Sequence, residues 1–339
     1  MSPNSGIGWN PKFAESDLDT LYSLICDHPL GILVTGSLPS SSAPNIDLHS
    51  TYILFVLDTP GSPDRTTGTL GLLRGHIARG SPHAKALMQT LQNTNATNSN
   101  SDSDSGSDSD STNQTLPQEA MVLFTSPTSS YITPFFYSSR KSGTTGDGKV
   151  VPTWFSRAVQ VYGSVRLHHD ASPGSTASRF LKRQLQDLTR HGESHMMRFP
   201  ESEAWRVGDA PVEFVDRLSR AIVGVEIRNC RIEEKSKLGQ EVRAEDQLGA
   251  VRGLRGLGTK GGAELAGLVE EDMRRKEERK VVLERDGRLV RGEKVKGPNG
   301  WYYTATSPLA VKSVDIVECG MWVMALLALA YGLLMSVLG

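Results

Sequence analysis

This sequence of 339 residues has few cysteines, almost no net charge and no glycine-rich nucleotide-binding motif. The three cysteines, Cys26, Cys230 and Cys319, lie far apart and form no Cys-x-x-Cys pair, which excludes a disulfide framework and suits a reducing compartment. Because the formal net charge is −1, no overall positive field draws the protein to nucleic acid. The chain has no P-loop, no Gly-x-Gly-x-x-Gly turn after a strand and no Gly-x-Ser-x-Gly elbow. These absences count against NTPase, Rossmann and hydrolase classes.

The two ends of the sequence differ in character. The first residues, MSPNSGIGWNPKF, lack the basic and apolar regions of a secretory signal, so we expect a protein that is not secreted. Residues 319–339 carry no charged side chain and are long enough to cross a bilayer as a helix. We therefore expect a cytoplasmic-facing protein with a membrane tail anchor at 319–339. A buried core helix or an error in the gene model are the alternatives.

Hydrophobic periodicity predicts a mainly β fold with peripheral helices. Residues 158–167 alternate so that Val159, Val161, Gly163, Val165 and Leu167 share one face of a strand. Many strands with few helices between them are typical of a β-barrel. The other predicted strands are 31–36, 50–58, 69–77, 120–127 and 221–234, and the predicted helices are 13–27, 82–92, 176–191, 212–220 and 264–285.

Composition divides the chain into a folded domain with an insertion, a charged extension and the apolar tail at 319–339. Residues 9–256 carry the strand patterns of a folded domain. Within them, residues 93–118 are rich in serine, aspartate and asparagine, and we expect a disordered insertion because such a segment cannot bury a core. Residues 257–318 predict a charged helical extension. Since its acids nearly match its bases, a solvated helix is a better interpretation than a nucleic-acid surface.

The stretch GHIARGSPHAKAL gathers many anion-binding groups at one predicted helix start. A Ser-Pro pair is typical of an N-cap followed by the first helical residue. Free N–H groups and the helix dipole make such a start a ready anion site, so a bound phosphate explains the composition, and an ordinary surface turn is the alternative. The candidate phosphate-binding residues are His76, Arg79, Ser81, His83 and Lys85.

A second constellation, HGESH, places His191 and His195 four residues apart, as metal ligands on a helix are spaced. Gly192 interrupts the helix pattern and no third ligand is evident. We therefore predict no metal site.

Five segments, in this order, resemble the PaiB-type family of FMN-binding split-barrel proteins, often labelled negative transcriptional regulators. The similarity runs from about Trp9 to Leu254. The segments are NPKFAESDLDTLYSLICDHPLGILVT, GHIARGSPH, SSYITPFFY, VPTWFSRAVQVYG and AIVGVEIRNCRIEEKSKLGQ.

The resemblance implies a split β-barrel that forms a homodimer and holds FMN at the dimer interface. In the wider class the phosphate lies near the start of a helix that follows a core strand, which matches the turn described above. Motif positions add Thr153, Trp154, Lys237 and Gln240 to the candidate cofactor-binding residues. No catalytic residue is identified.

The sequence departs from the family pattern at several motif positions. Phe155 and Ser156 replace an Asn-Tyr pair, Gly239 and Glu241 replace serine and asparagine, and Phe136 replaces tryptophan. An acid at Glu241 would be unfavourable beside an FMN phosphate. Ser81 replaces an asparagine and preserves the helix cap.

Three functions fit these features. The first is a flavin-binding regulator or sensor, for which we expect no direct DNA contact, because the chain has no helix-turn-helix, zinc finger or basic face. The second is an FMN-dependent oxidoreductase of the flavin reductase or pyridoxamine-phosphate oxidase type. The third is a membrane-tethered binding module whose flavin site has decayed.

Overall fold

The computed structural model describes residues 17–36, 47–59, 70–98, 114–140, 148–285, 294–296 and 302–304. The chain divides into two compact units, residues 1–269 and 270–339. The first unit contains the large sheet and its helices. In the second, α7 (Lys260–Arg285) continues from the first unit, and two short strands pair with each other, β9 (Lys294–Lys296) and β10 (Tyr302–Thr304).

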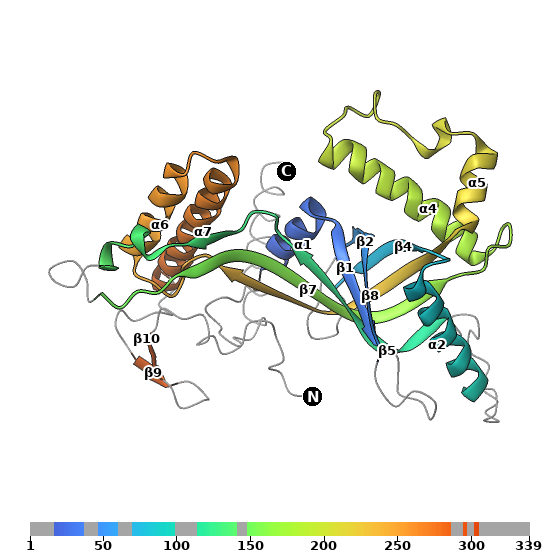
Figure 1. Ribbon diagram of the computed structural model, residues 1–339, viewed down its shortest axis with the longest axis horizontal. Coiled ribbons are helices and arrows are strands. Elements are labelled where there is room, and N and C mark those ends of the chain that lie inside the picture. The colour runs from blue at the N-terminus through green and yellow to red at the C-terminus, as the bar shows by residue number, and fades with distance from the viewer. Residues whose placement is uncertain are drawn as a thin grey trace, which may run out of the picture. The chain divides into compact units, whose positions relative to one another are not determined.

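An antiparallel sheet of eight strands forms the first unit (Figure 1). Its hydrogen-bonded order is β2-β1-β5-β7-β8-β4-β3, with β6 paired to β7. At Phe55 one extended segment breaks into β2 and β3, and β2 pairs with β1 while β3 pairs with β4. The strand order therefore returns to the segment where it began. The strands are β1 (Leu30–Gly36), β2 (Leu48–Leu54), β3 (Val56–Asp58), β4 (Leu72–Ala78), β5 (Thr115–Thr125), β6 (Ser130–Ile132), β7 (Thr153–His168) and β8 (Ile222–Lys237).

The main core lies against the inward faces of these strands. Val159, Val161, Val165 and Leu167 are all fully buried, which confirms the predicted inward face of β7. Side chains that alternate along β1, β4, β5 and β8 join them in one cluster. Helix α1 (Leu18–Asp27) adds its apolar face to this cluster and is capped by Asp17.

Helices form a larger part of the described chain than expected, so the fold is mixed α/β rather than mainly β. Helix α4 covers the outer face of β4, β7 and β8 (Figure 1), where Phe180 stacks on His168 at 3.8 Å. Helix α6 was not predicted at all. The helices of this unit that follow α1 are α2 (Pro82–Asn98), α4 (Thr176–Arg190), α5 (Val212–Arg220) and α6 (Ala244–Gly256). The short 3₁₀ or π turns are η2 (Pro134–Phe136), η3 (Ser138–Arg140), η4 (His191–Met196) and η5 (Val207–Asp209).

Strands β7 and β8 extend beyond the main core as a paired arm toward α6 (Figure 1). We call the end of β7 near Trp154, the end of β8 near Lys237, β6 and α6 the β7–β8 arm. The carboxylate of Asp246 on α6 accepts hydrogen bonds from Ser138 and Ser139 and so fixes η3 to the arm. The arm has buried apolar side chains of its own, among them Ile132, Tyr137, Phe155, Leu238 and Leu254.

Both ends of the segment expected to be disordered, residues 93–118, belong to regular secondary structure. Helix α2 continues to Asn98 instead of ending near residue 92, and β5 begins at Thr115. Residues 99–113 lie outside the described residues, as does the expected membrane tail at 319–339. Of the helices that the structure describes, none is both long and apolar enough to span a bilayer.

Candidate functional site

The turn between β4 and α2, which we call the β4–α2 corner, forms the helix start that the sequence predicts. The Ser81 hydroxyl accepts a hydrogen bond from the Ala84 N–H at 3.1 Å, and Pro82 is the first residue of α2. The Lys85 side chain, one turn into the helix, is exposed. The corner therefore presents a helix N-terminus and a free-standing cation toward solvent.

Arg79 uses its guanidinium group to join β4 to the start of β8. Its Nη2 donates to the carbonyl oxygens of His169 and Ile222 at 2.8 and 3.1 Å, and its Nε donates to that of Arg220 at 3.0 Å. These bonds give Arg79 a structural function. Its predicted phosphate contact stays a prediction.

His83 lies inside the corner rather than on its surface. Its Nε2 is 2.9 Å from the Thr35 hydroxyl and its Nδ1 is 2.8 Å from the Thr51 hydroxyl. His49 stacks on the ring at 5.4 Å. Thr35 ends the first family segment and His83 ends the second, so two motifs far apart in the sequence meet here. Sequence reasoning missed Thr35, His49 and Thr51, because only the sheet register places them beside α2.

Burial of His83, with a smaller contribution from His49, lowers the pKa of its imidazole from 6.5 to about 4. The folded state thus prefers neutral His83, and the unfolded chain binds more protons between pH 6.5 and 4. We expect the free energy of unfolding to be highest above pH 6.5 and to fall by about 2–3 kcal/mol as pH drops toward 4. Urea unfolding of wild type and His83→Gln at pH 7, 6, 5 and 4.5 measures this. The stability difference between the two proteins should shrink as pH falls, and a constant difference would contradict a neutral His83.

His76 lies on the outward face of β4, where its Nδ1 is 2.9 Å from Gln184 Oε1 on α4. Burial lowers the pKa of this histidine, partly offset by the Gln184 hydrogen bond. The structure therefore places the two histidines in different surroundings. His76 contacts α4, whereas His83 contacts β1 and β2.

The other four predicted residues lie on the β7–β8 arm. Trp154 on β7 is 54% exposed and lies opposite Tyr131 in the register of β6 with β7. Thr153, which precedes Trp154, is half-buried. Gln240 closes the end of β8, accepting from the Leu238 N–H at 2.7 Å and donating to the Ser236 carbonyl at 2.8 Å. Lys237 forms an ion pair with Glu241 at 3.1 Å. The acid that would repel a phosphate is thus neutralised by a neighbouring lysine.

Two departures from the family pattern compensate each other on the arm. Phe155 is fully buried, and a Cβ atom built at Gly239 would lie 2.8 Å from its Cζ. Gly239 also has φ +87°, a conformation that glycine adopts readily. The larger side chain at 155 therefore occupies space that a side chain at 239 would need.

Within one chain, the corner and the arm lie at opposite ends of β8. His76 pairs with Gly224, and Ser156 pairs with Lys237, thirteen residues further along the strand. At about 3.3 Å per residue this separation is roughly 40 Å along β8. The structure thus divides the predicted site residues into two groups that cannot contact the same small ligand in one chain.

The HGESH histidines have structural partners. His191 Nε2 is 2.8 Å from the Cys26 carbonyl oxygen, His195 Nε2 is 2.9 Å from Asp27 Oδ1, and the two rings stack at 4.8 Å. Across the described ranges, no three His, Cys, Asp or Glu side chains are arranged to hold a metal ion.

Comparison with protein families identifies the family whose motifs this chain carries. The family model described as "Putative FMN-binding domain" matches residues 9–231. The chain belongs to this FMN-binding family. The resemblance inferred from the five segments is confirmed, although the match ends before Lys237 and Gln240.

Two fungal relatives extend over most of the chain. An uncharacterized protein of Aspergillus fumigatus is 40% identical over 265 residues, covering 76% of this chain and 94% of its own. An uncharacterized protein of Emericella nidulans is 38% identical over 258 residues, with the same coverage of 76% and 94%. Neither relative carries a described regulatory function.

Solved structures show only a distant likeness. The flavocytochrome Anf3 from Azotobacter vinelandii has a TM-score of 0.35 and 10% identity, covering 70% of this chain and 74% of that one. General Stress Protein 26 from Bacillus anthracis has a TM-score of 0.27 and 10% identity, covering 64% and 92%. Scores this low carry no functional argument.

Proposed function

We propose that the protein binds FMN as a homodimer, with each site built from the β4–α2 corner of one copy and the β7–β8 arm of the other. The observation that carries this proposal is the separation of roughly 40 Å along β8 between the two groups of site residues. FMN is far shorter than that distance. Residues from both groups can contact one FMN only if they come from different chains.

The corner suits the phosphate of FMN. The first N–H groups of α2 have no partner within the helix, and the helix dipole favours a negative charge there. The Lys85 ammonium adds a solvent-exposed positive charge one turn away. The Ser81 hydroxyl accepts from Ala84 and keeps its own proton available to donate.

The arm suits the flat ring of the flavin. Trp154 is 54% exposed and Tyr131, opposite it on β6, is 52% exposed, so two large aromatic faces are open on neighbouring strands. Aromatic stacking on a planar ring is worth about 1 kcal/mol beyond the area that it buries. FMN bound there would supply hydride-transfer chemistry, while the protein positions it.

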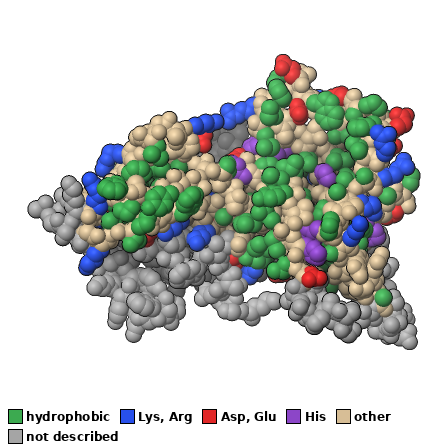
Figure 2. Space-filling model, in the orientation of Figure 1, with side chains coloured by type: hydrophobic (Ala, Val, Ile, Leu, Met, Phe, Trp, Pro, Cys, Tyr) green, Lys and Arg blue, Asp and Glu red, His purple; other side chains and the backbone are tan. Residues whose placement is uncertain are grey.

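Each chain exposes an apolar surface on its sheet, against which a second copy of the chain can pack. The outward face of β1 and β2 exposes Leu30, Leu48, Tyr52 and Leu54, at 43–76% of their surface. Hydrophobic side chains gather over β1 on the face shown in Figure 2. An exposed apolar patch on a sheet is typical of a protein–protein contact.

A heterodimer experiment tests the composite site. Lys85→Glu damages the corner and Trp154→Ala damages the arm, and each homodimer should bind FMN at least about tenfold more weakly than wild type. When the two variants are co-expressed with different tags and the heterodimer is isolated, one of its two sites contains an intact corner and an intact arm. We expect that heterodimer to bind one FMN with wild-type affinity, measured by flavin absorbance.

The controls separate the outcomes. Lys182→Glu, an exposed charge reversal on α4, should leave FMN binding unchanged. A heterodimer without FMN, or a monomer that binds FMN, would show that the site lies within one chain and would overturn the proposal. Once FMN is bound, NADH and NADPH oxidation distinguishes an oxidoreductase from a sensor.

A further inference from the structure

A hollow of about 620 Å³ lies between the C-terminal half of α4, η4 and strands β3 and β4. It is separate from the corner and the arm, and none of the predicted flavin-binding residues lines it. Its volume is within the range of small-molecule sites. Its polar lining consists of Arg74, Arg183, Arg190, His191, Ser194 and His195, together with the carboxylates Asp58 and Asp187.

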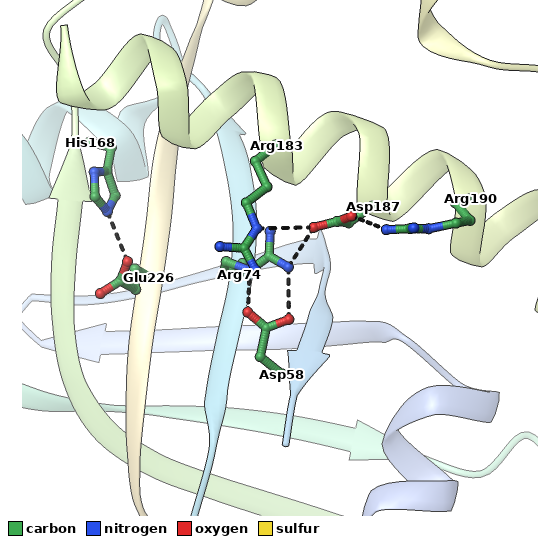
Figure 3. Close-up of polar contacts among 7 residues, drawn as sticks. All are labelled: Asp58, Arg74, His168, Arg183, Asp187, Arg190 and Glu226. Atoms are coloured by element: carbon green, nitrogen blue, oxygen red, sulfur yellow. Dashed lines mark hydrogen bonds and ion pairs between the residues drawn. The ribbon is translucent and has the colours of Figure 1, made fainter. Parts of the chain in front are cut away.

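Three arginines surround one carboxylate in this hollow (Figure 3). Asp187 accepts from Arg74 Nη2 at 2.8 Å, lies 3.5 Å from Arg183 Nε and pairs with Arg190. Asp58 holds Arg74 from the other side, at 2.6 Å to Nε and 2.7 Å to Nη2. Three guanidinium groups thus share two carboxylates, which leaves one positive charge among the arginines and aspartates that line the hollow.

Donors also exceed acceptors. A guanidinium group carries about five N–H donors, and two carboxylates cannot accept from all of those that meet here. Arg74 is 5% exposed at its side chain, and its Nη1 is shielded from solvent with no hydrogen-bond partner in the described part of the chain. By contrast, Arg183 and Arg190 each keep 72% of their side-chain surface exposed. Their unused donors face the hollow from the same side of α4.

We propose that this hollow binds a small phosphate-bearing metabolite, with its phosphate group held by Arg183 and Arg190. Guanidinium groups match phosphate oxygens in geometry and form charge-assisted hydrogen bonds with them. The Ser194 hydroxyl lies at the same hollow and adds a donor, while Nε2 of His191 and Nε2 of His195 are already bonded to Cys26 and Asp27. Asp58 and Asp187 remain paired with buried Arg74, so the two exposed arginines are the groups that an incoming phosphate recruits.

Inorganic phosphate is the probe, and unfolding temperature and calorimetry are the readouts. Wild type should bind phosphate and gain thermal stability beyond the effect of chloride at equal ionic strength. The double variant Arg183→Gln/Arg190→Gln should bind at least about tenfold more weakly. The matched control Arg217→Gln/Arg220→Gln removes two exposed arginines from α5 and should bind as wild type does.

Wild type alone provides a second test that does not depend on any variant. Phosphate should shift the ring resonances of His191 and His195 in an NMR titration and leave those of His49 unchanged. Equal responses of the two double variants, or stabilisation no greater than that from chloride, would overturn the proposal. So would displacement of FMN by phosphate at the concentrations that fill the hollow, because the hollow would then be part of the flavin site.

Discussion

Arg74→Met should lower the free energy of unfolding by about 3–4 kcal/mol. The Arg74 side chain is 5% exposed and forms ion pairs with Asp58 on β3 and with Asp187 on α4 (Figure 3). Without it, two carboxylates remain in a partly buried layer without their main cation. Breaking a buried ion pair costs about 3–5 kcal/mol, and the lower part of that range applies because Asp58 is 35% exposed. Tm should fall by about 10 °C, measured by calorimetry.

Two comparison variants test the cause of this loss. Arg183→Met removes an arginine that contacts the same Asp187 but is 72% exposed, and it should cost less than about 0.5 kcal/mol. The double variant Arg74→Met/Asp58→Asn should recover part of the lost stability, because Asp58 loses its charge together with its Arg74 partner, while Asp187 keeps Arg183 and Arg190. A loss below about 1 kcal/mol for Arg74→Met would mean that α4 is held to the sheet without this charge cluster.

Much of the sheet could be predicted because its signals are local. The alternation of β7 and the apolar runs of β1, β4 and β8 depend on side-chain patterns that a single strand displays. The break at Phe55 could not be predicted, since the segment reads as one apolar strand. It depends on which neighbours each half pairs with.

Helix α6 escaped prediction for a related reason. Its glycines give it a weak helical signal in the sequence. A Cβ atom at Gly249 would lie 2.2 Å from the Phe136 carbonyl oxygen, so tertiary packing against η2 requires a residue without a side chain there. Packing between distant segments therefore overrides local propensity in the β7–β8 arm.

The candidate site was predicted as a set of residues but not as an arrangement. Each helix-start signal in GSPHAK holds, yet the sequence could not show that His83 points inward to Thr35 and Thr51. Nor could it show that Trp154 and Lys85 belong to different ends of the molecule. Those facts follow from strand register, which depends on pairing between residues far apart in the chain.

Gly163→Ala should destabilise the protein by about 3 kcal/mol or more. Gly163 closes the VPTWFSRAVQVYG segment and lies at an irregularity in the pairing of β7 with β8, where the register shifts between Tyr162 and Gly163. A Cβ atom there would lie 2.0 Å from the Arg228 carbonyl oxygen and 2.8 Å from its carbonyl carbon. Both obstacles are backbone atoms of the neighbouring strand, so no side-chain rotation can relieve the clash.

The damage should extend beyond the point of substitution, because β7 and β8 pair along both the main sheet and the arm. To admit the new methyl group, the two strands must separate, and the hydrogen bonds beside the irregularity must lengthen. Chemical denaturation measures the loss, and soluble yield is the readout if the variant fails to fold. Gly208→Ala is the matched control: no described atom lies within 4 Å of the Cβ position there, and its stability should stay within about 0.5 kcal/mol of wild type. If Gly163→Ala behaved like that control, the β7–β8 pairing would have to open at this point in the native protein, and the arm would not be held at a fixed distance from the corner.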